Sequence, residues 1–123
     1  MRKTILYVDD ESINLLLFQA ILGSKYNIVI AESGDAGLRQ LNANPDTVGV
    51  ISDMRMPGMN GLEFIKSAKA IFPELFYFIL TGYDITPAIS NALEEKLIHK
   101  YFRKPLNHVE IENAIEEAIN GKQ

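Results

Sequence analysis

The sequence predicts an α/β fold, a doubly wound five-stranded parallel sheet in the order 2-1-3-4-5 flanked by five helices as a three-layer sandwich. Five short apolar or β-rich runs open about 21 to 28 residues apart, which is the spacing of a strand, a helix and a return rather than of hairpins. Three of these runs are apolar almost throughout, as expected for strands covered on both faces. The segments between them repeat apolar residues at helical spacing.

The first strand is expected at Ile5–Val8, followed by an amphipathic helix that ends near Gly23. Five apolar residues of this helix share one face, which is the face that periodicity assigns to the core. They are Ile13, Leu16, Leu17, Ala20 and Ile21.

The second strand is expected at Asn27–Ile30 and the third at Val48–Ser52. Between them, Ser33 is placed to cap a helix that Asn44-Pro45 would end. The apolar residues of that helix are Ala36, Leu38 and Leu41.

After the third strand, Asn60 and Glu63 have the spacing of a capping box and open a helix. The residues that we expect this helix to bury are Leu62, Ile65 and Ala68. The fourth strand is expected at Phe76–Leu80, and Thr86-Pro87 marks the start of the next helix. Its apolar stripe consists of Ile89, Ala92, Leu93 and Leu97.

The fifth strand is expected at Ile98–Phe102, and the last helix opens on a second capping-box pair, Asn107 and Glu110. Gly121 is expected to end it. Its core positions are Ile111, Ala114, Ile115, Ala118 and Ile119.

The composition is that of one soluble globular domain, which we place at residues 1–123: 47% of the residues are hydrophobic and 23% are charged. A net charge of -4 argues against direct binding to DNA or RNA. The absence of cysteine excludes disulfides, thiolate catalysis and thiolate metal sites. The longest apolar run, Leu75 to Leu80, is too short to span a membrane, and the N-terminus lacks the apolar core of a signal peptide. We therefore expect a cytoplasmic protein with no membrane partner.

Polar residues follow four of the five predicted strands. The first runs into Asp9 and Asp10, the third ends at Asp53, the fourth at Thr81 and the fifth at Lys104. Because the carboxyl ends of parallel strands meet at one edge of a sheet, we expect these side chains to form a cluster.

The predicted cluster carries an excess of negative charge, since three aspartates face one lysine. Two carboxylates about 4 Å apart repel by about 4 kcal/mol at an effective dielectric constant near 20. A divalent cation would balance this charge, and Mg²⁺ suits a site with few protein ligands, all of them oxygen. Asp53 stands singly and is the candidate nucleophile for a phosphoryl group, whereas Asp9 and Asp10 are adjacent and suited to holding the ion.

Four segments in register, ILYVDDE, SDMRMPGMNG, ILTGY and YFRKP, resemble the receiver domain of two-component response regulators, with its flavodoxin-like, chemotaxis-regulator-like fold. The resemblance runs from Ile5 to Ile119. It implies that Asp53 accepts a phosphoryl group from a phosphohistidine of a sensor kinase or a histidine phosphotransfer protein. It also implies that Mg²⁺ is bound by the three aspartates and the backbone carbonyl of Arg55.

By the same resemblance, Thr81 and Lys104 would contact the phosphoryl oxygens, and the Lys104-Pro105 peptide bond would be cis. Signalling would move the Thr81 hydroxyl and turn Tyr101 inward. The face from Thr86 to Asn120 would then change its preference for an output domain, a partner protein or a second copy of the chain.

Two further side chains bear on the lifetime of the phosphoryl group. Arg55 lies two residues beyond Asp53 and Tyr83 two residues beyond Thr81, positions that in receivers overlook the phosphoryl group. A bulky pair there is expected to slow attack by water.

Two other functions stay open at this point. One is a receiver-fold interaction module that works without phosphorylation. The other is a Mg²⁺-dependent phosphatase with an aspartyl nucleophile, but enzymes of that kind resembling the haloacid dehalogenases carry a second acid two residues after the nucleophile, where this chain has Arg55. The leading interpretation is a switch that catalyses only its own phosphoryl transfer and slow dephosphorylation, and is otherwise not an enzyme.

Overall fold

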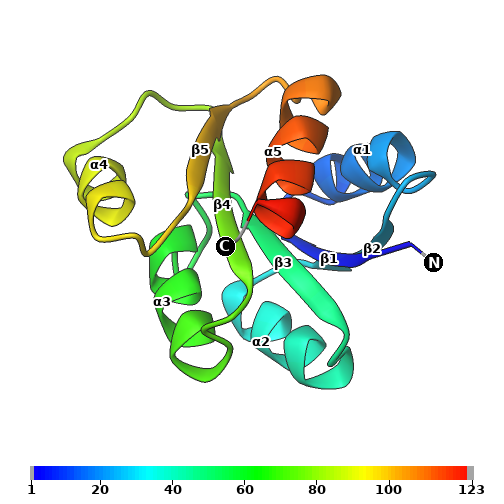
Figure 1. Cartoon of the computed structure of the whole chain (residues 1–123). Coiled ribbons are helices and arrows are strands. Elements are labelled where there is room, and N and C mark those ends of the chain that lie inside the picture. Colours follow the sequence, from blue (N-terminus) through cyan, green and yellow to red (C-terminus); the bar gives the residue numbers. More distant parts are fainter. Residues whose placement is uncertain (1, 122–123) are drawn as a thin grey trace.

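The computed structural model describes residues 2–121, and within them the strand order is β2-β1-β3-β4-β5 with all neighbours parallel (Figure 1). The predicted fold class and strand order are confirmed. In chain order the elements are β1 (Thr4–Val8), α1 (Ser12–Leu22), β2 (Asn27–Ala31), α2 (Gly34–Ala43), β3 (Thr47–Ser52), α3 (Gly61–Ile71), β4 (Phe76–Thr81), α4 (Pro87–Glu94), β5 (Lys100–Arg103) and α5 (His108–Asn120).

Two helices, α1 and α5, cover one face of the sheet, and α2, α3 and α4 cover the other (Figure 1). Each face therefore has its own apolar core. β1 and β4 are buried along their whole length because both faces are covered, which explains why their sequences are continuously apolar rather than alternating. No helix within residues 2–121 has the length and apolar character needed to cross a membrane.

Side-chain caps begin four of the helices where the sequence predicts them. Ser33, Asn60, Thr86 and Asn107 each accept a hydrogen bond from the backbone N–H three residues on, at 2.9 to 3.3 Å. The Glu63 carboxylate also accepts the N–H of Asn60 at 2.8 Å, which completes the capping box of α3. Each such cap is worth about 1 kcal/mol and fixes where its helix starts.

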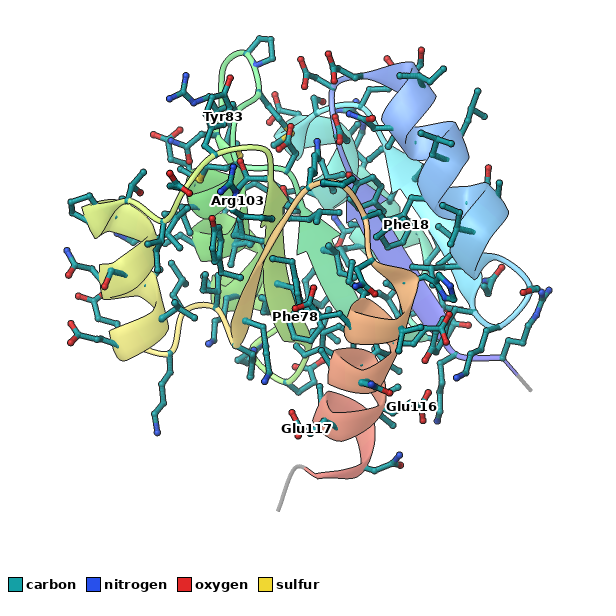
Figure 2. All side chains as sticks on the ribbon, turned by 90° about the horizontal axis from the view of Figure 1, so that it is seen from above. Phe18, Phe78, Tyr83, Arg103, Glu116 and Glu117 are labelled. Atoms are coloured by element: carbon teal, nitrogen blue, oxygen red, sulfur yellow. The ribbon has the colours of Figure 1, made fainter. Side chains whose placement is uncertain are left out.

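The apolar face predicted for α1 is wrong. The buried residues are Leu15, Phe18 and Leu22, and Figure 2 labels Phe18 on the side of α1 that faces the sheet. The ring of Phe18 stacks on that of Tyr7 with the centroids 4.0 Å apart. The predicted stripe instead faces solvent, with exposed fractions of 66% for Ile13, 60% for Leu16, 52% for Leu17 and 40% for Ile21, and Ala20 is also exposed. Because α1 is apolar on more than one side, periodicity alone does not identify the face that packs on the sheet.

Two smaller expectations also differ from the structure. β5 begins at Lys100 rather than Ile98, and Ile98 is buried in the loop before it. In α3 the fully buried aromatic is Phe64, whereas Leu62 is only half-buried. The helix winds Phe64 toward the sheet and leaves Leu62 at the margin of the core.

Backbone hydrogen bonds continue past the strand ends and fix the residues that follow them. The N–H of Asp9 donates to the carbonyl of Ala31 at 3.1 Å, and the N–H of Asp53 donates to the carbonyl of Val8 at 2.8 Å. The N–H of Lys104 donates to the carbonyl of Thr81 at 2.8 Å. These hydrogen bonds fix the carboxyl ends of all five strands at the same edge of the sheet.

Candidate functional site: an acidic cluster at the sheet edge

Three aspartates converge at the carboxyl edge of the sheet. Asp9 and Asp10 follow β1 and Asp53 follows β3, and one carboxylate oxygen from each lies within 4.8 Å of the others. Asp9 and Asp53 are buried, whereas Asp10 is exposed. The cluster expected from the strand ends is present, with one of its carboxylates open to solvent.

Lys104, at the end of β5, provides the positive charge next to this cluster. Its Nζ lies 3.0 Å from Oδ2 of Asp9 and 3.6 Å from Oδ1 of Asp53. The peptide bond that joins it to Pro105 is cis. One ammonium thus bridges two buried carboxylates and partly balances their charge.

Asp9 is fully buried, and both of its oxygens have donors. Oδ1 accepts the N–H of Glu11 at 3.0 Å, while Oδ2 accepts the hydroxyl of Tyr7 at 2.7 Å as well as the Lys104 ammonium. Burial, followed by the nearby Asp9 charge, raises the pKa of Tyr7, so the hydroxyl keeps its proton and donates it. The sequence interpretation did not include Tyr7, although residues two apart on a strand point to the same face and the signal was available.

Asp53 is held in place by a backbone donor. Its Oδ1 accepts the N–H of Met54 at 2.9 Å. Burial raises the pKa of Asp53 to about 6, with Lys104 acting in the opposite direction and Asp9 adding to the rise. A carboxylate in this environment is poorly solvated. A bound cation or a reaction that neutralises its charge therefore stabilises it more than it would stabilise an exposed aspartate.

Thr81, the last residue of β4, is fully buried, and its Oγ1 has no hydrogen-bond partner within residues 2–121. A buried hydroxyl without a partner costs about 1–3 kcal/mol. The Thr81 hydroxyl would therefore be stabilised by a hydrogen bond to an acceptor that enters the site beside it.

The donor set fits Mg²⁺. Carboxylate oxygens from three residues, two of them buried, offer hard ligands close together and leave room for water. The remaining negative charge is only partly balanced by Lys104, which favours a divalent cation. The residues that would hold the ion are Asp9, Asp10 and Asp53, and Arg55 follows Asp53 closely enough in the chain to offer a carbonyl.

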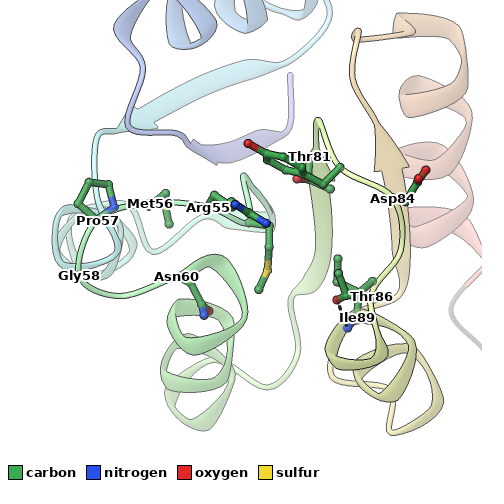
Figure 3. Close-up of a pocket in the computed structure, with 11 residues that line it drawn as sticks. Arg55, Met56, Pro57, Gly58, Asn60, Thr81, Asp84, Thr86 and Ile89 are labelled. Atoms are coloured by element: carbon green, nitrogen blue, oxygen red, sulfur yellow. Dashed lines mark hydrogen bonds between the residues drawn. The ribbon is translucent and has the colours of Figure 1, made fainter.

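A pocket of about 600 Å³ opens next to the cluster, between the loops that follow β3 and β4 (Figure 3). Arg55 lines it from the loop after β3, and Thr81 and Tyr83 line it from the end of β4 and the loop that follows. The guanidinium of Arg55 lies over the ring of Tyr83, 4.0 Å from its centroid. The hydroxyl of Tyr101 donates to the carbonyl of Tyr83 at 2.6 Å and ties β5 to the same loop.

Comparison with protein families identifies this architecture. The family model for the response regulator receiver domain matches residues 5–116, which is most of the chain. The chain is a response regulator receiver domain. The family inferred from the four sequence segments is confirmed.

Individual relatives agree with this assignment. The receiver domain is 32% identical to the transcriptional regulatory protein ZraR of Escherichia coli over 94% of its own length, but covers only 26% of that protein. It superposes with a TM-score of 0.85 on a response regulator receiver domain from Clostridium thermocellum, at 32% identity, covering 97% of this chain and 95% of the other. For the response regulator TrrA of Thermotoga maritima, solved with Mg²⁺ and BeF, the TM-score is 0.82 at 27% identity, with 96% and 99% covered. The receiver domain thus spans about a quarter of the curated relatives' length and nearly all of these solved chains.

Proposed function

We propose that this receiver domain is a phosphorylation-controlled signalling switch in which Asp53 accepts a phosphoryl group from a phosphohistidine of a sensor kinase or a histidine phosphotransfer protein. The observation that carries the proposal is the position of Asp53, a buried carboxylate flanked by Asp9, Asp10 and the Lys104 ammonium. In this proposal residues 1–123 act as one unit, which catalyses only its own phosphoryl transfer and slow dephosphorylation.

In the proposed reaction a carboxylate oxygen of Asp53 forms a bond to phosphorus as the phosphorus–nitrogen bond to the donor histidine breaks. The electron pair of that bond leaves with the imidazole. Mg²⁺, held by the three aspartates and the Arg55 carbonyl, would supply positive charge to the phosphoryl oxygens. Lys104 moves from the carboxylates to a phosphoryl oxygen, and the unpartnered Thr81 hydroxyl donates to another.

The test uses a small phosphoryl donor such as acetyl phosphate, with Mg²⁺, and intact-protein mass spectrometry. The wild-type domain should gain one phosphoryl group, and Asp53→Asn should gain none, because the amide is not a nucleophile. Asp46→Asn is the matched control, since this aspartate lies before β3 at the opposite edge of the sheet. Uptake that persists in Asp53→Asn would refute the proposal. Unchanged partner binding in that variant would favour an interaction module that works without phosphorylation. Repeated turnover of a phosphoester would instead favour a phosphatase.

The proposed output surface is the face made by α4, β5 and α5. The hydroxyl of Tyr101, in β5, bonds to the Tyr83 carbonyl, two residues from Thr81. A movement of Thr81 toward a phosphoryl group would therefore be transmitted to Tyr101 and to this face. Reversing a 1:99 equilibrium between two conformations of the domain requires about 5.5 kcal/mol of differential interaction. The Thr81 and Lys104 contacts together with repacking of Tyr101 would have to supply this free energy. An output domain, a separate partner or a second copy would read the change.

The Arg55–Tyr83 pair is proposed to set the lifetime of the phosphoryl group, because the two stacked side chains line the pocket that also contains Thr81 and Met54, the residue after Asp53. Removing both side chains, in Arg55→Ala with Tyr83→Ala, should speed dephosphorylation about tenfold by admitting water. Loss of phosphoryl group from purified, prephosphorylated protein, followed by mass spectrometry, measures this rate. Arg103→Ala is the control, because it removes an exposed arginine that bonds Asp84 at 2.7 Å in the same loop. An unchanged rate in the double variant would exclude the shielding role.

The exposed stripe of α1 is proposed to contact the protein that carries the phosphohistidine. α1 starts three residues after Asp9, its side chains Ile13, Leu16 and Leu17 are exposed, and Leu17 lines a pocket together with Lys104. Replacing Ile13 and Leu16 with serine should slow transfer from a phosphodonor protein at least tenfold and leave phosphorylation by acetyl phosphate unchanged. Ile71→Ser, which alters an exposed apolar residue at the end of α3, is the control. Equal loss with both donors would indicate damage to the site instead.

A further inference from the structure

The hydroxyl of Tyr7 is the one part of this side chain that the hydrophobic core does not need. Its ring stacks on Phe18 at 4.0 Å with a 6° angle between the planes, and the residue is only 1% exposed. Phenylalanine would fill the same space with the same stacking. The hydroxyl reaches the acidic cluster, where it donates to Oδ2 of Asp9 at 2.7 Å.

We propose that Tyr7 is a positioning residue for the metal site, whose hydroxyl fixes the orientation of the Asp9 carboxylate. This inference rests on the proposed function, because it concerns the ion that the phosphoryl transfer requires. Removing a group that hydrogen-bonds to a metal ligand and orients it typically weakens metal binding about 10- to 100-fold.

The division of donors between the two oxygens of Asp9 supports this role. Oδ1 is held by the backbone N–H of Glu11, whereas Oδ2 is shared by Tyr7 and Lys104. In the proposed reaction Lys104 leaves Oδ2 for a phosphoryl oxygen. Tyr7 is then the remaining side-chain donor to Oδ2 among the described residues, so the carboxylate keeps its orientation while the lysine moves.

The burial of Asp9 makes the effect of this donor large. Asp9 has an exposed fraction of 0%, so water does not replace a lost donor easily. Without the Tyr7 hydroxyl, Lys104 is the remaining side-chain donor to Oδ2 among the described residues, so the carboxylate loses one of the contacts that fix the orientation it shares with Asp10 and Asp53. A metal site whose ligand must be reoriented on binding has a lower affinity than one that is already arranged.

The experiment is a titration of the unphosphorylated protein with MgCl2 alone, by isothermal calorimetry, together with the rise in Tm that saturating Mg²⁺ produces. Tyr7→Phe should bind Mg²⁺ about tenfold more weakly and show a smaller Mg²⁺-dependent rise in Tm than wild type at the same concentration. Tyr26→Phe is the matched control. Tyr26 is also buried, and its hydroxyl donates to a carboxylate, Oε2 of Glu116, at 2.6 Å. Tyr26→Phe should lower Tm without Mg²⁺ and leave the Mg²⁺ affinity unchanged.

Two results separate the positioning role from its alternatives. An unchanged Mg²⁺ affinity in Tyr7→Phe, with a loss of Tm like that of Tyr26→Phe, would overturn the proposal and leave a structural hydrogen bond only. In the Asp9→Asn background, Tyr7→Phe should produce no further loss of affinity, and a full additional loss would also contradict it. Mg²⁺ binding is measured without a phosphodonor. The titration therefore tests the role of Tyr7 even if the Asp53→Asn phosphorylation test refutes the proposed function.

Discussion

Lys104→Ala should lower the free energy of unfolding of the metal-free domain at pH 7 by about 2–3 kcal/mol and slow phosphorylation of Asp53 at least 100-fold. The ammonium bridges Asp9 at 3.0 Å and Asp53 at 3.6 Å, and its removal leaves two buried carboxylates without a cation. Removing one partner of a fully buried pair costs about 3–5 kcal/mol, and the 23% exposure of the lysine side chain reduces this. The kinetic loss follows from removing a charge that stabilises the transferring phosphoryl group.

The stability loss in Lys104→Ala should depend on pH in a defined direction. Lys104 lowers the pKa of Asp53, so without the lysine that pKa rises above its value of about 6. A carboxyl group with a pKa raised above that of the unfolded chain binds more protons when folded, so stability increases as the pH falls. The deficit of the variant relative to wild type should therefore shrink between pH 7 and pH 5, and Mg²⁺ should also reduce it at pH 7.

Urea denaturation with EDTA or with MgCl2, at several pH values, measures the free energies of unfolding. Lys100→Ala is the matched control because its partner, Glu117, is 71% exposed, and such surface pairs contribute little. Equal destabilisation by the two substitutions, or a deficit that grows toward pH 5, would contradict the charge argument.

The sequence predicted the sheet order and most of the acidic cluster, because both follow from connectivity. Parallel strands joined by helices have few arrangements, and residues directly after strands must meet at one edge. The strand ends carry Asp9, Asp53 and Thr81 to that edge whatever the details of packing. The helix starts were predictable for a similar reason, since a cap such as Ser33 acts on a backbone group three residues away.

What depends on long-range packing was not predictable from a pattern. α1 has two apolar stripes, and packing against other elements, such as the stacking of Phe18 on Tyr7, determines which stripe is buried. By contrast, the 2.7 Å contact of Tyr7 with Asp9 is local, and it was missed because the tyrosine was counted only as part of an apolar strand. The absence of a partner for the Thr81 hydroxyl among residues 2–121 depends on side chains from several segments and is visible only in three dimensions.

Gly61→Ala should destabilise the domain by about 3 kcal/mol and slow phosphorylation of Asp53 about 10- to 100-fold, although the residue carries no functional group. Gly61 is the first residue of α3, and its N–H donates to the Met54 carbonyl at 2.8 Å. A Cβ there would overlap the carbonyl oxygen of Asp53 and come within 3.0 Å of the Cα of Met54. Both are backbone atoms, so no side chain can turn away to make room.

The backbone that would have to move is the segment that orients the Asp53 carboxylate through the Met54 N–H. A displacement of about 1 Å in a reacting group can cost about 100-fold in rate, so the substitution should affect chemistry as well as stability. Gly82→Ala provides the control at the same edge of the sheet, because a Cβ on Gly82 meets nothing within 4 Å. Thermal denaturation and the rate of acetyl phosphate labelling measure the two effects. If Gly61→Ala lost stability but kept the wild-type labelling rate, the loop would have moved without displacing Asp53. That result would contradict the proposed dependence of the phosphorylation site on the start of α3.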